Sequence, residues 1–349
     1  MRALAPSTVV REGSICDHGE TMESCATVTV MISTYNEESH IDRCLDAVLA
    51  QTVPVSVIVI DGGSSDRTVE RLKSRASRDA RIRIHADGIR RTLPAALNLA
   101  LTMCDAAYVA KVDARTFIAS DFIERALDVF GSEGAGVACA GGRPEQFGET
   151  RFGEGVARAR TSRFGVGGSG YADQRTRADV DTVQCGVYRC AAVREVGGFD
   201  PDLQFGEDEE LNWRLRRKGY RIVLDTNIRF EYLTRSTWVA AFRQYRNYGR
   251  ARARVVSKHP DFLRPRHLAP SLALVAVPVL LCAAPISRPV LALFASLAAI
   301  YCSGALLAAA SSSREWRTVP YTAAAFTALH FGYGIGLLEE SIRRRVATT

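Results

Sequence analysis

Residues 55–66, VSVIVIDGGSSD, decide the fold of this 349-residue chain. An almost continuously apolar run, Val55–Ile60, ends there in a polar turn that contains two glycines. Such a run is typical of a strand that is covered on both faces, as strands of parallel sheets are. A helix from Thr68 is predicted to follow the turn. The stretch therefore predicts one strand–turn–helix unit of an α/β fold.

The flanking sequence repeats this alternation of strand and helix. The predicted elements around the deciding stretch are a strand at Val28–Ser33, a helix at Glu38–Gln51, a strand at Ile82–His85, a helix at Pro94–Met103 and a strand at Ala107–Val112. We expect an open, mostly parallel sheet flanked by helices. In such sheets ligands bind at the carboxyl ends of the strands, where the polar residues after Ser33, Ile60 and Val112 fall.

The following part of the chain has a different pattern. Phe147–Asp181 is rich in Gly and Arg and is predicted to be a long loop region with a helix near Gly153–Thr161. Further elements are predicted as a strand at Val183–Arg189, a short helix at Ala192–Val196, a helix at Glu209–Lys218 and a strand at Arg221–Leu224.

The composition limits the class of partner and the compartment. The formal net charge is +7, with Arg residues concentrated at Arg243–Arg266, just before an apolar region, which favours a membrane surface. No nucleic-acid-binding motif accompanies the charge, so we expect no nucleic acid partner. The nine Cys include no CxxC pair and are expected to be reduced, buried thiols of a cytoplasmic domain. The first residues lack the apolar core of a secretory signal.

Three apolar stretches follow the predicted sheet domain, at Leu268–Ile286, Val290–Ala310 and Val319–Leu338. Each is about long enough to span a hydrocarbon core of ~30 Å. The amphipathic, Arg-rich Thr237–Val256 suits a membrane surface. If all three stretches crossed, Arg343–Arg345 would emerge opposite the catalytic domain, against the positive-inside rule. The sequence leaves two or three crossings open, in a multi-pass protein of the inner or cell membrane.

These patterns predict five segments. They are a mobile tail at 1–26, an α/β catalytic domain at 27–235, an amphipathic interfacial helix or linker at 236–266, a transmembrane region at 267–340 and a basic tail at 341–349.

The loops after the first two strands are candidates for nucleotide binding. Short polar side chains and exposed backbone at a strand end can hold a base and ribose, and Asp61 can accept a hydrogen bond from either. The alternative is structural, with Thr34, Asn36 or Asp66 capping the next helix. The candidate residues are Thr34, Tyr35, Asn36, Glu37, Asp61, Gly62, Ser64 and Asp66.

Two later motifs carry acids. In KVDAR, residues 111–115, the carboxylate of Asp113 can hold a divalent ion that bridges a diphosphate. The alternative is a surface ion pair between Asp113 and Arg115. In GEDEEL, residues 206–211, four consecutive acids begin a helix, and one acid facing a pocket would suit a general base. The alternative is a solvated helix start.

Together, TYNE, DGGSSD, DAR and GEDEEL resemble the motifs of family 2 glycosyltransferases with the GT-A fold. DTVQCGVYRC (181–190), GEDEELNWRLRRKGYRI (206–222) and YGRARAR (248–254) look like those of bacterial exopolysaccharide glucosyltransferases of the succinoglycan type. The resemblance covers Val28 to Lys258. It implies an inverting transfer of a hexose, glucose, from a UDP-sugar to a polyprenyl-diphosphate-linked or other glycan acceptor.

The resemblance also implies roles for residues. Asp61 would contact the nucleotide base, and Asp113 would bind a Mg²⁺ or Mn²⁺ on the donor diphosphate. Asp208 would be the base that deprotonates the acceptor hydroxyl, and Glu207 would orient it or the acceptor. Lys111 is grouped with the donor-binding residues.

The chain departs from the family pattern at two places. Arg115 replaces the second acid of the DxD motif and cannot bind a cation, so we expect it to pair with the diphosphate. QYRNY, residues 244–248, lacks the Trp of the processive QxxRW signature, which predicts addition of a single sugar per acceptor. Two alternatives are a non-catalytic membrane scaffold that retains the fold and a sugar nucleotidyltransferase. The latter would want a Gly-rich phosphate loop near the start, which is missing.

Overall fold

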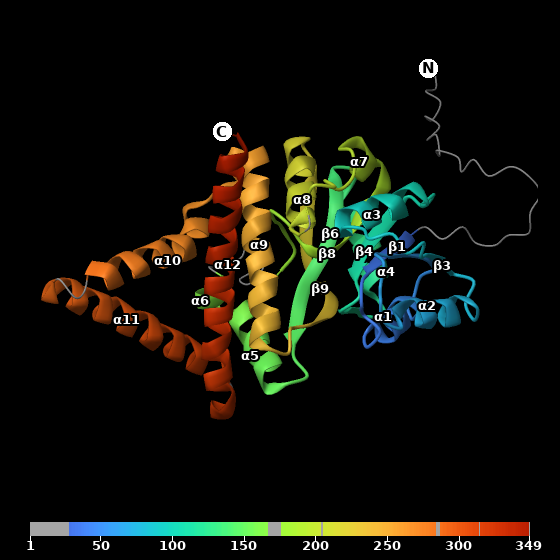
Figure 1. Ribbon diagram of the computed structural model, residues 1–349. Helices are drawn as coiled ribbons and strands as arrows, with labels where there is room; N and C mark the ends of the chain where they lie inside the picture. Colours follow the sequence, from blue (N-terminus) through green and yellow to red (C-terminus); the bar gives the residue numbers. More distant parts are fainter. Residues whose placement is uncertain (1–27, 167–175, 204, 284–286, 314, 349) are drawn as a thin grey trace, which may run out of the picture.

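A central sheet with helices on both faces forms the body of the protein (Figure 1). The computed structural model describes residues 28–166, 176–203, 205–283, 287–313 and 315–348. The predicted tail at 1–26 and part of the predicted Gly-rich loop lie outside these ranges. Two long helices, α9 and α12, stand beside the sheet, and the α10–α11 hairpin projects away from them (Figure 1).

The strands are β1 Val28–Thr34, β2 Val55–Asp61, β3 Ile82–His85, β4 Tyr108–Asp113, β5 Thr116–Ile118, β6 Val137–Phe147, β7 Ala178–Asp179, β8 Gln184–Arg189 and β9 Arg221–Leu233. The α-helices are α1 Ile41–Leu49, α2 Thr68–Ala76, α3 Leu93–Thr102, α4 Phe122–Glu133, α5 Arg151–Thr161, α6 Arg163–Val166, α7 Cys190–Glu195, α8 Glu207–Arg217, α9 Trp238–Lys258, α10 Pro265–Ala283, α11 Arg288–Ser312 and α12 Val319–Thr348.

The register of the sheet aligns the ends of three strands. The order is β3-β2-β1-β4-β8-β6-β9-β5, with β7 paired to β9. The pairs among β1, β2, β3 and β4 are parallel, whereas β8 is antiparallel to both of its neighbours. Thr34 lies opposite Asp61, and Ser33 lies opposite Asp113. The predicted mostly parallel α/β sheet is confirmed, and the polar strand ends meet at one edge.

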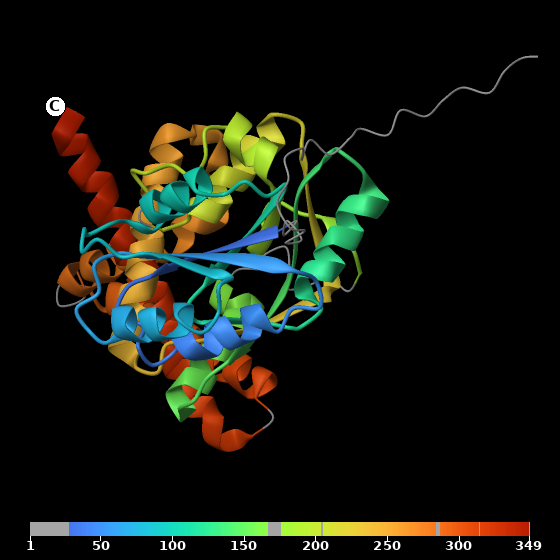
Figure 2. The same ribbon diagram turned by 90° about the vertical axis from the view of Figure 1, so that its right-hand side faces the viewer.

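Two hydrophobic layers enclose the sheet. Helices α1, α2 and α4 bury one side of it through Ile41, Leu72 and Phe122 among others. Helices α3, α7 and α8 cover the other side, with Leu97 and Leu211 fully or almost fully buried. Figure 2 shows α1 and α2 on one side of the sheet and α3 on the other. Both faces are therefore dry, as the apolar strands require.

The second half of the domain contains more regular structure than the sequence predicts. The strand predicted at Arg221–Leu224 continues to Leu233 as β9, which pairs in parallel with the whole of β6. The predicted helix near Gly153–Thr161 is present as α5. Five of the described cysteines are buried and free, whereas Cys302 is exposed and free.

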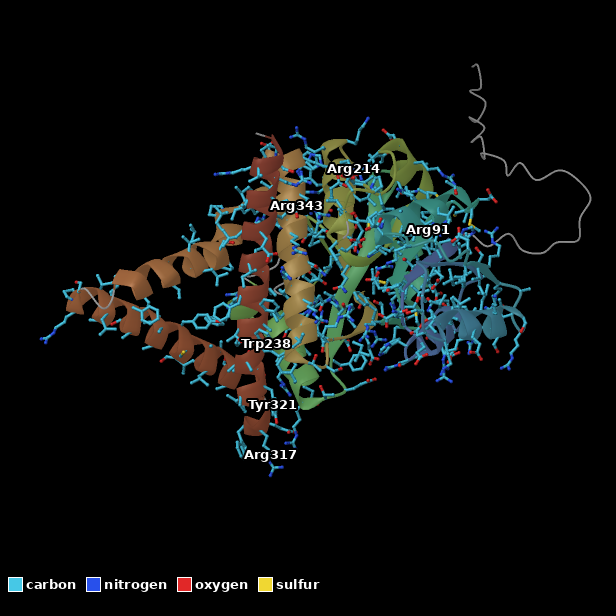
Figure 3. All side chains as sticks on the ribbon, in the orientation of Figure 1. Arg91, Arg214, Trp238, Arg317, Tyr321 and Arg343 are labelled. Carbon is cyan, nitrogen blue, oxygen red and sulfur yellow. The ribbon has the colours of Figure 1, made fainter. Side chains whose placement is uncertain are left out.

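Helix α12 packs along α9 through glycines. The two helices run in the same direction, since Trp238 and Tyr321 lie near their starts and Arg343 near the opposite end (Figure 3). A Cβ on Gly336 would lie 1.9 Å from the Arg246 carbonyl oxygen, so only glycine allows this approach. At the end of α12, Glu339 pairs with Arg246 and with Arg250.

One helix among the described residues, α11, is long and apolar enough to cross a membrane. Helix α10 has only a shorter apolar part, at His267–Val277. The third predicted stretch lies in α12, whose Phe326 and Leu329 are buried against the protein body. The structure therefore does not support the two or three crossings of the predicted multi-pass topology. Apolar runs that pack on protein and those that face lipid look alike in sequence.

Candidate active site

The loop after β2 is organised by Asp61, which is 1% exposed. Its Oδ2 accepts hydrogen bonds from the backbone N–H groups of Gly63 and Ser64, each at 2.9 Å, and its Oδ1 accepts one from Ser64 Oγ. Gly63 has a φ of +83°, which a glycine adopts without strain. Asp61 therefore fixes the turn that places Gly62 on the wall of a large cavity.

The loop after β1 is tied to the loop after β2. Asn36, with a φ of +54°, accepts a hydrogen bond from Ser65 N at 2.8 Å and donates its own N–H to Ser64. Asp66 accepts from the Glu38 backbone N–H and from Thr68. Although burial alone would raise it, these bonds hold the pKa of Asp66 below its usual value. The loop after β1 and the loop after β2 are therefore held together by hydrogen bonds.

The predicted donor-binding residues thus divide into two groups. Four of them do not line the cavity and instead form hydrogen bonds within and between the two loops, namely Asn36, Asp61, Ser64 and Asp66, whereas the remaining candidates line the cavity. The lining residues among the predictions are Thr34, Tyr35, Glu37, Gly62, Lys111, Asp113, Arg115, Glu207 and Asp208. Thr34 Oγ1 is buried and has no hydrogen-bond partner among the described residues.

Arg115 pairs with a carboxylate of the protein. Its Nε lies 3.1 Å from both carboxylate oxygens of Glu37, which also bonds His40 at 2.8 Å. Burial would raise the pKa of Glu37, but the hydrogen bond from His40 and the charge of Arg115 hold it below its usual value. Arg115 therefore orients Glu37 at the cavity wall.

Lys111 is the centre of the acid cluster. It is 2% exposed, at the middle of the sheet, and its Nζ lies 2.8 Å from Asp208 Oδ2, 2.9 Å from Glu207 Oε1 and 3.2 Å from Asp113 Oδ1. Burial alone would lower the pKa of Lys111, but the three carboxylates raise it well above its usual value. The ammonium is therefore held charged, and it joins β4 to the start of α8.

Asp208 has the properties of a proton acceptor. Burial, together with the neighbouring Glu207 and Asp113, raises its pKa to about 7 against the opposing effect of Lys111. Its Oδ1 is buried without a hydrogen-bond partner among the described residues, while Lys111 holds Oδ2. A carboxylate with one oxygen anchored and the other free can take a proton from a bound hydroxyl.

Asp113 is a suitable carboxylate for a divalent ion. Its side chain is 35% exposed at the cavity, and Mg²⁺ in nucleotide sites commonly takes one or two carboxylates plus substrate phosphates. Within the described ranges, no group of three or more His, Cys, Asp or Glu residues gathers into a metal site of its own. The residues present therefore fit an ion that arrives with a diphosphate.

Several cavity residues were missed by sequence reasoning. Arg90 lies over the Tyr35 ring, 3.5 Å from its centroid, and donates to the Gly62 carbonyl oxygen at 3.0 Å. Arg91 lines the cavity beside it (Figure 3). Two adjacent arginines in the loop between β3 and α3 could have indicated that this loop contributes to a binding site. The cavity has a volume of about 1690 Å³ and continues from these residues to helices α9–α12.

Known proteins are similar to this chain in sequence and in fold. The model of the glycosyl transferase family 2 matches residues 29–197. The succinoglycan biosynthesis protein ExoA of Rhizobium meliloti is 28% identical over 334 residues, 91% of this chain and 96% of that protein. A dolichyl N-acetyl-alpha-D-glucosaminyl phosphate 3-beta-D-2,3-diacetamido-2,3-dideoxy-beta-D-glucuronosyltransferase of Methanococcus voltae is 25% identical over 66% of this chain and 74% of its own length.

Among solved structures, the mannosyltransferase PcManGT from Pyrobaculum calidifontis, in complex with GDP-Man and Mn²⁺, has a TM-score of 0.60. It is 21% identical, and the match covers 88% of this chain and 87% of that chain, so the likeness concerns the fold. The sheet, the order of the motifs and the family match agree. Residues 29–197 match the domain of glycosyl transferase family 2, and the chain has a GT-A-like α/β fold.

Proposed function

We propose that this protein transfers a hexose, glucose, from a UDP-sugar to a glycan acceptor with inversion, in the synthesis of an envelope or exported polysaccharide. The observation that carries the proposal is the cluster of Lys111, Asp113, Glu207 and Asp208 at the cavity wall. It brings Asp208, a base with a pKa of about 7, next to Asp113, the carboxylate that we propose to face the donor diphosphate. The similarity to a succinoglycan biosynthesis protein supports the pathway class.

In this proposal Asp208 removes the proton of the acceptor hydroxyl through its free Oδ1. A base titrating near neutral pH is half deprotonated there and still accepts a proton effectively. Lys111 holds Oδ2 at 2.8 Å and so fixes the direction of the carboxylate. Glu207, whose Oε1 lies 2.9 Å from the same ammonium, helps to hold Lys111 in this position. Attack by the hydroxyl from the face opposite the diphosphate inverts the anomeric carbon in one displacement.

The donor half of the cavity would hold the nucleotide diphosphate. Thr34, Tyr35 and Gly62 supply polar atoms and a close backbone approach for the base and ribose. Asp113 would hold a Mg²⁺ or Mn²⁺, whose charge would offset that developing on the leaving diphosphate. Arg115 would affect donor binding indirectly, because it pairs with Glu37 and so orients that carboxylate in the donor half of the cavity.

The acceptor is proposed to be linked to a lipid, and the protein to be attached to the cell membrane with its catalytic domain in the cytoplasm. The projecting α10–α11 hairpin includes a helix able to cross a bilayer, and the cavity reaches it. The name of one relative describes transfer onto a sugar carried by dolichyl phosphate. A single addition per acceptor is proposed, because Tyr248 stands where a processive signature has Trp.

The test measures nucleoside diphosphate release from a panel of nucleotide sugars by the full chain in membranes that contain a lipid-acceptor extract. Asp208→Asn is expected to lower release about 10²–10⁴-fold, the usual contribution of a general base. Asp105→Asn, an exposed acid in the loop before β4, is the matched control and should act like the wild type. Equal release by Asp208→Asn and the wild type would refute the assignment of the base.

The same assay separates the alternatives. Release of inorganic diphosphate from a nucleoside triphosphate would indicate a sugar nucleotidyltransferase. Binding of a nucleotide sugar without release in any acceptor extract would indicate a scaffold. Long homopolymeric products would contradict the single addition.

A further inference from the structure

Arg160, on α5, is a partly buried cation that lines the cavity and that the catalytic cluster does not use. Its Nε and Nη1 atoms are buried and have no hydrogen-bond partner among the described residues. The groups with the largest electrostatic effect on Arg160 are the three tyrosines Tyr232, Tyr245 and Tyr248. No carboxylate is among these groups. Burying an uncompensated charge is costly, so a ligand of opposite charge would stabilise this arrangement.

The tyrosines around Arg160 provide further donors. Gln244 Nε2 donates to Tyr232 Oη at 3.1 Å and to Tyr248 Oη at 2.9 Å. Because these hydroxyls accept from the amide, each keeps its own O–H proton for another acceptor. The guanidinium lies 5.0 Å from the centroid of the Tyr232 ring, which fixes its position. One cation and nearby hydroxyl donors, with no acid among them, suit a phosphate.

Arg160 lies between the acid cluster and an apolar groove. On one side, the Tyr248 ring lies 6.2 Å from the ring of Phe205, which directly precedes the Gly206-Glu207-Asp208 segment. On the other side, four residues after Arg160 and on α6, the Phe164 ring lies 5.9 Å from the ring of Tyr301 and 4.9 Å from that of Phe326. Arg160 therefore lines the part of the cavity between the catalytic acids and the groove.

The groove is formed by the projecting hairpin and α12. Its apolar lining includes Ala273, Leu274 and Val277 of α10, Phe294 and Leu297 of α11, and Leu329 of α12. Hydrocarbon in the groove would stay in contact with the helix that is able to cross a bilayer. The groove and Arg160 together are complementary to a molecule with an anionic head and an apolar tail.

We propose that Arg160, with the hydroxyls of Tyr232 and Tyr248, binds the phosphate of an isoprenoid-phosphate acceptor whose hydrocarbon chain lies in this groove. The inference rests on the proposed transferase function and names the part of the acceptor that the protein recognises. The sugar carried on that phosphate would then extend toward Asp208. The three tyrosines beside Arg160 belong to β9 and α9, whereas the donor loops follow β1 and β2.

Isothermal titration calorimetry on the full chain in detergent tests the proposal, with farnesyl diphosphate, farnesol, inorganic diphosphate and UDP as probes. Farnesyl diphosphate is expected to bind more tightly than farnesol or inorganic diphosphate. Arg160→Gln is expected to weaken its binding about ten- to a hundredfold and to leave UDP binding unchanged. Arg151→Gln, on an exposed position of the same helix, is the matched control and should change none of the four affinities.

Three results would overturn the proposal. Unchanged farnesyl diphosphate binding in Arg160→Gln would remove the residue from the site, and an equal loss of UDP binding would assign it to the donor. Inorganic diphosphate binding as tightly as farnesyl diphosphate would leave a free-anion site. If Arg160→Gln unfolds, Arg160→Lys keeps the charge and is expected to retain part of the affinity that Arg160→Met loses. These measurements need no turnover, so a failed release assay leaves them interpretable.

Discussion

Replacing Lys111 by Met tests whether its ammonium sets the protonation of Asp208. At 2.8 Å and an effective dielectric constant of about 20, the attraction between the two charges is about 6 kcal/mol. At about 1.36 kcal/mol per pKa unit, this sets a ceiling of about four pH units. Opposite charges this close usually shift a carboxyl by about 1–3 units, because solvent and relaxation screen the pair.

The sign of the effect follows from the role of the base. Asp208 must be deprotonated to act, so activity of the wild type is expected to rise with pH through about 7. Lys111 stabilises the carboxylate, and its removal raises the pKa of Asp208. The acid limb of the pH profile of kcat/KM is therefore expected to move upward by about 1–3 pH units in Lys111→Met.

The assay is nucleoside diphosphate release between pH 5.5 and 9.5 at one fixed Mg²⁺ concentration, with thermal unfolding to verify that each variant is folded. Lys111→Arg keeps the positive charge and is the matched control, with a limb close to that of the wild type. A limb that stays at the wild-type pH in folded Lys111→Met would refute the reasoning. Either Asp208 is then not the titrating base, or Lys111 does not control it.

Three further predictions concern the donor half of the cavity and the packing of α12 on α9. Arg115→Ala is expected to weaken nucleotide-sugar binding through Glu37, so a double-mutant cycle with Glu37→Gln should give a coupling of at least about 0.5 kcal/mol, and strictly additive losses would contradict the pair. Chelation of divalent ions is expected to stop release and Mg²⁺ or Mn²⁺ to restore it, with Asp113→Asn requiring more metal for half-maximal activity; full release with chelator present would exclude a metal role. Gly336→Ala is expected to lower stability by about 1–3 kcal/mol, because its Cβ would lie 1.9 Å from a carbonyl oxygen. Gly131→Ala, with open space around it, should be neutral or slightly stabilising in the same thermal unfolding measurement.

The strand ends were predictable because their signals are local. The apolar run at Val55–Ile60 and the polar turn after it identify the strand and its carboxyl end within a dozen residues. Parallel pairing then brings Thr34, Asp61 and Asp113 to one edge without further information. The sequence did not identify Lys111 as the cation that pairs with the GEDEEL acids Glu207 and Asp208.

The partners of the charged residues were not predictable, because they come from distant parts of the chain. Lys111 and Asp208 are 97 positions apart, and Arg115 and Glu37 are 78 apart. A lysine inside a strand and an arginine two residues after an acid have the same local sequence pattern whichever residue each pairs with. The packing of the apolar stretch of α12 on α9 was not predictable for a similar reason, since it depends on tertiary structure.

The packing of α12 on α9 and α5 has a consequence for how the protein is made. About 60 residues, including the whole α10–α11 hairpin, separate the end of α9 from the start of α12. At about 5–20 residues per second, a ribosome needs about 3–12 s to add them. During that time the sheet can fold, while the faces of α5 and α9 that later contact α12 remain exposed. Helix α12 can cover these faces only after it has been synthesised. A chain interrupted before Val319 would therefore expose the apolar faces of α5 and α9 to chaperones and proteases.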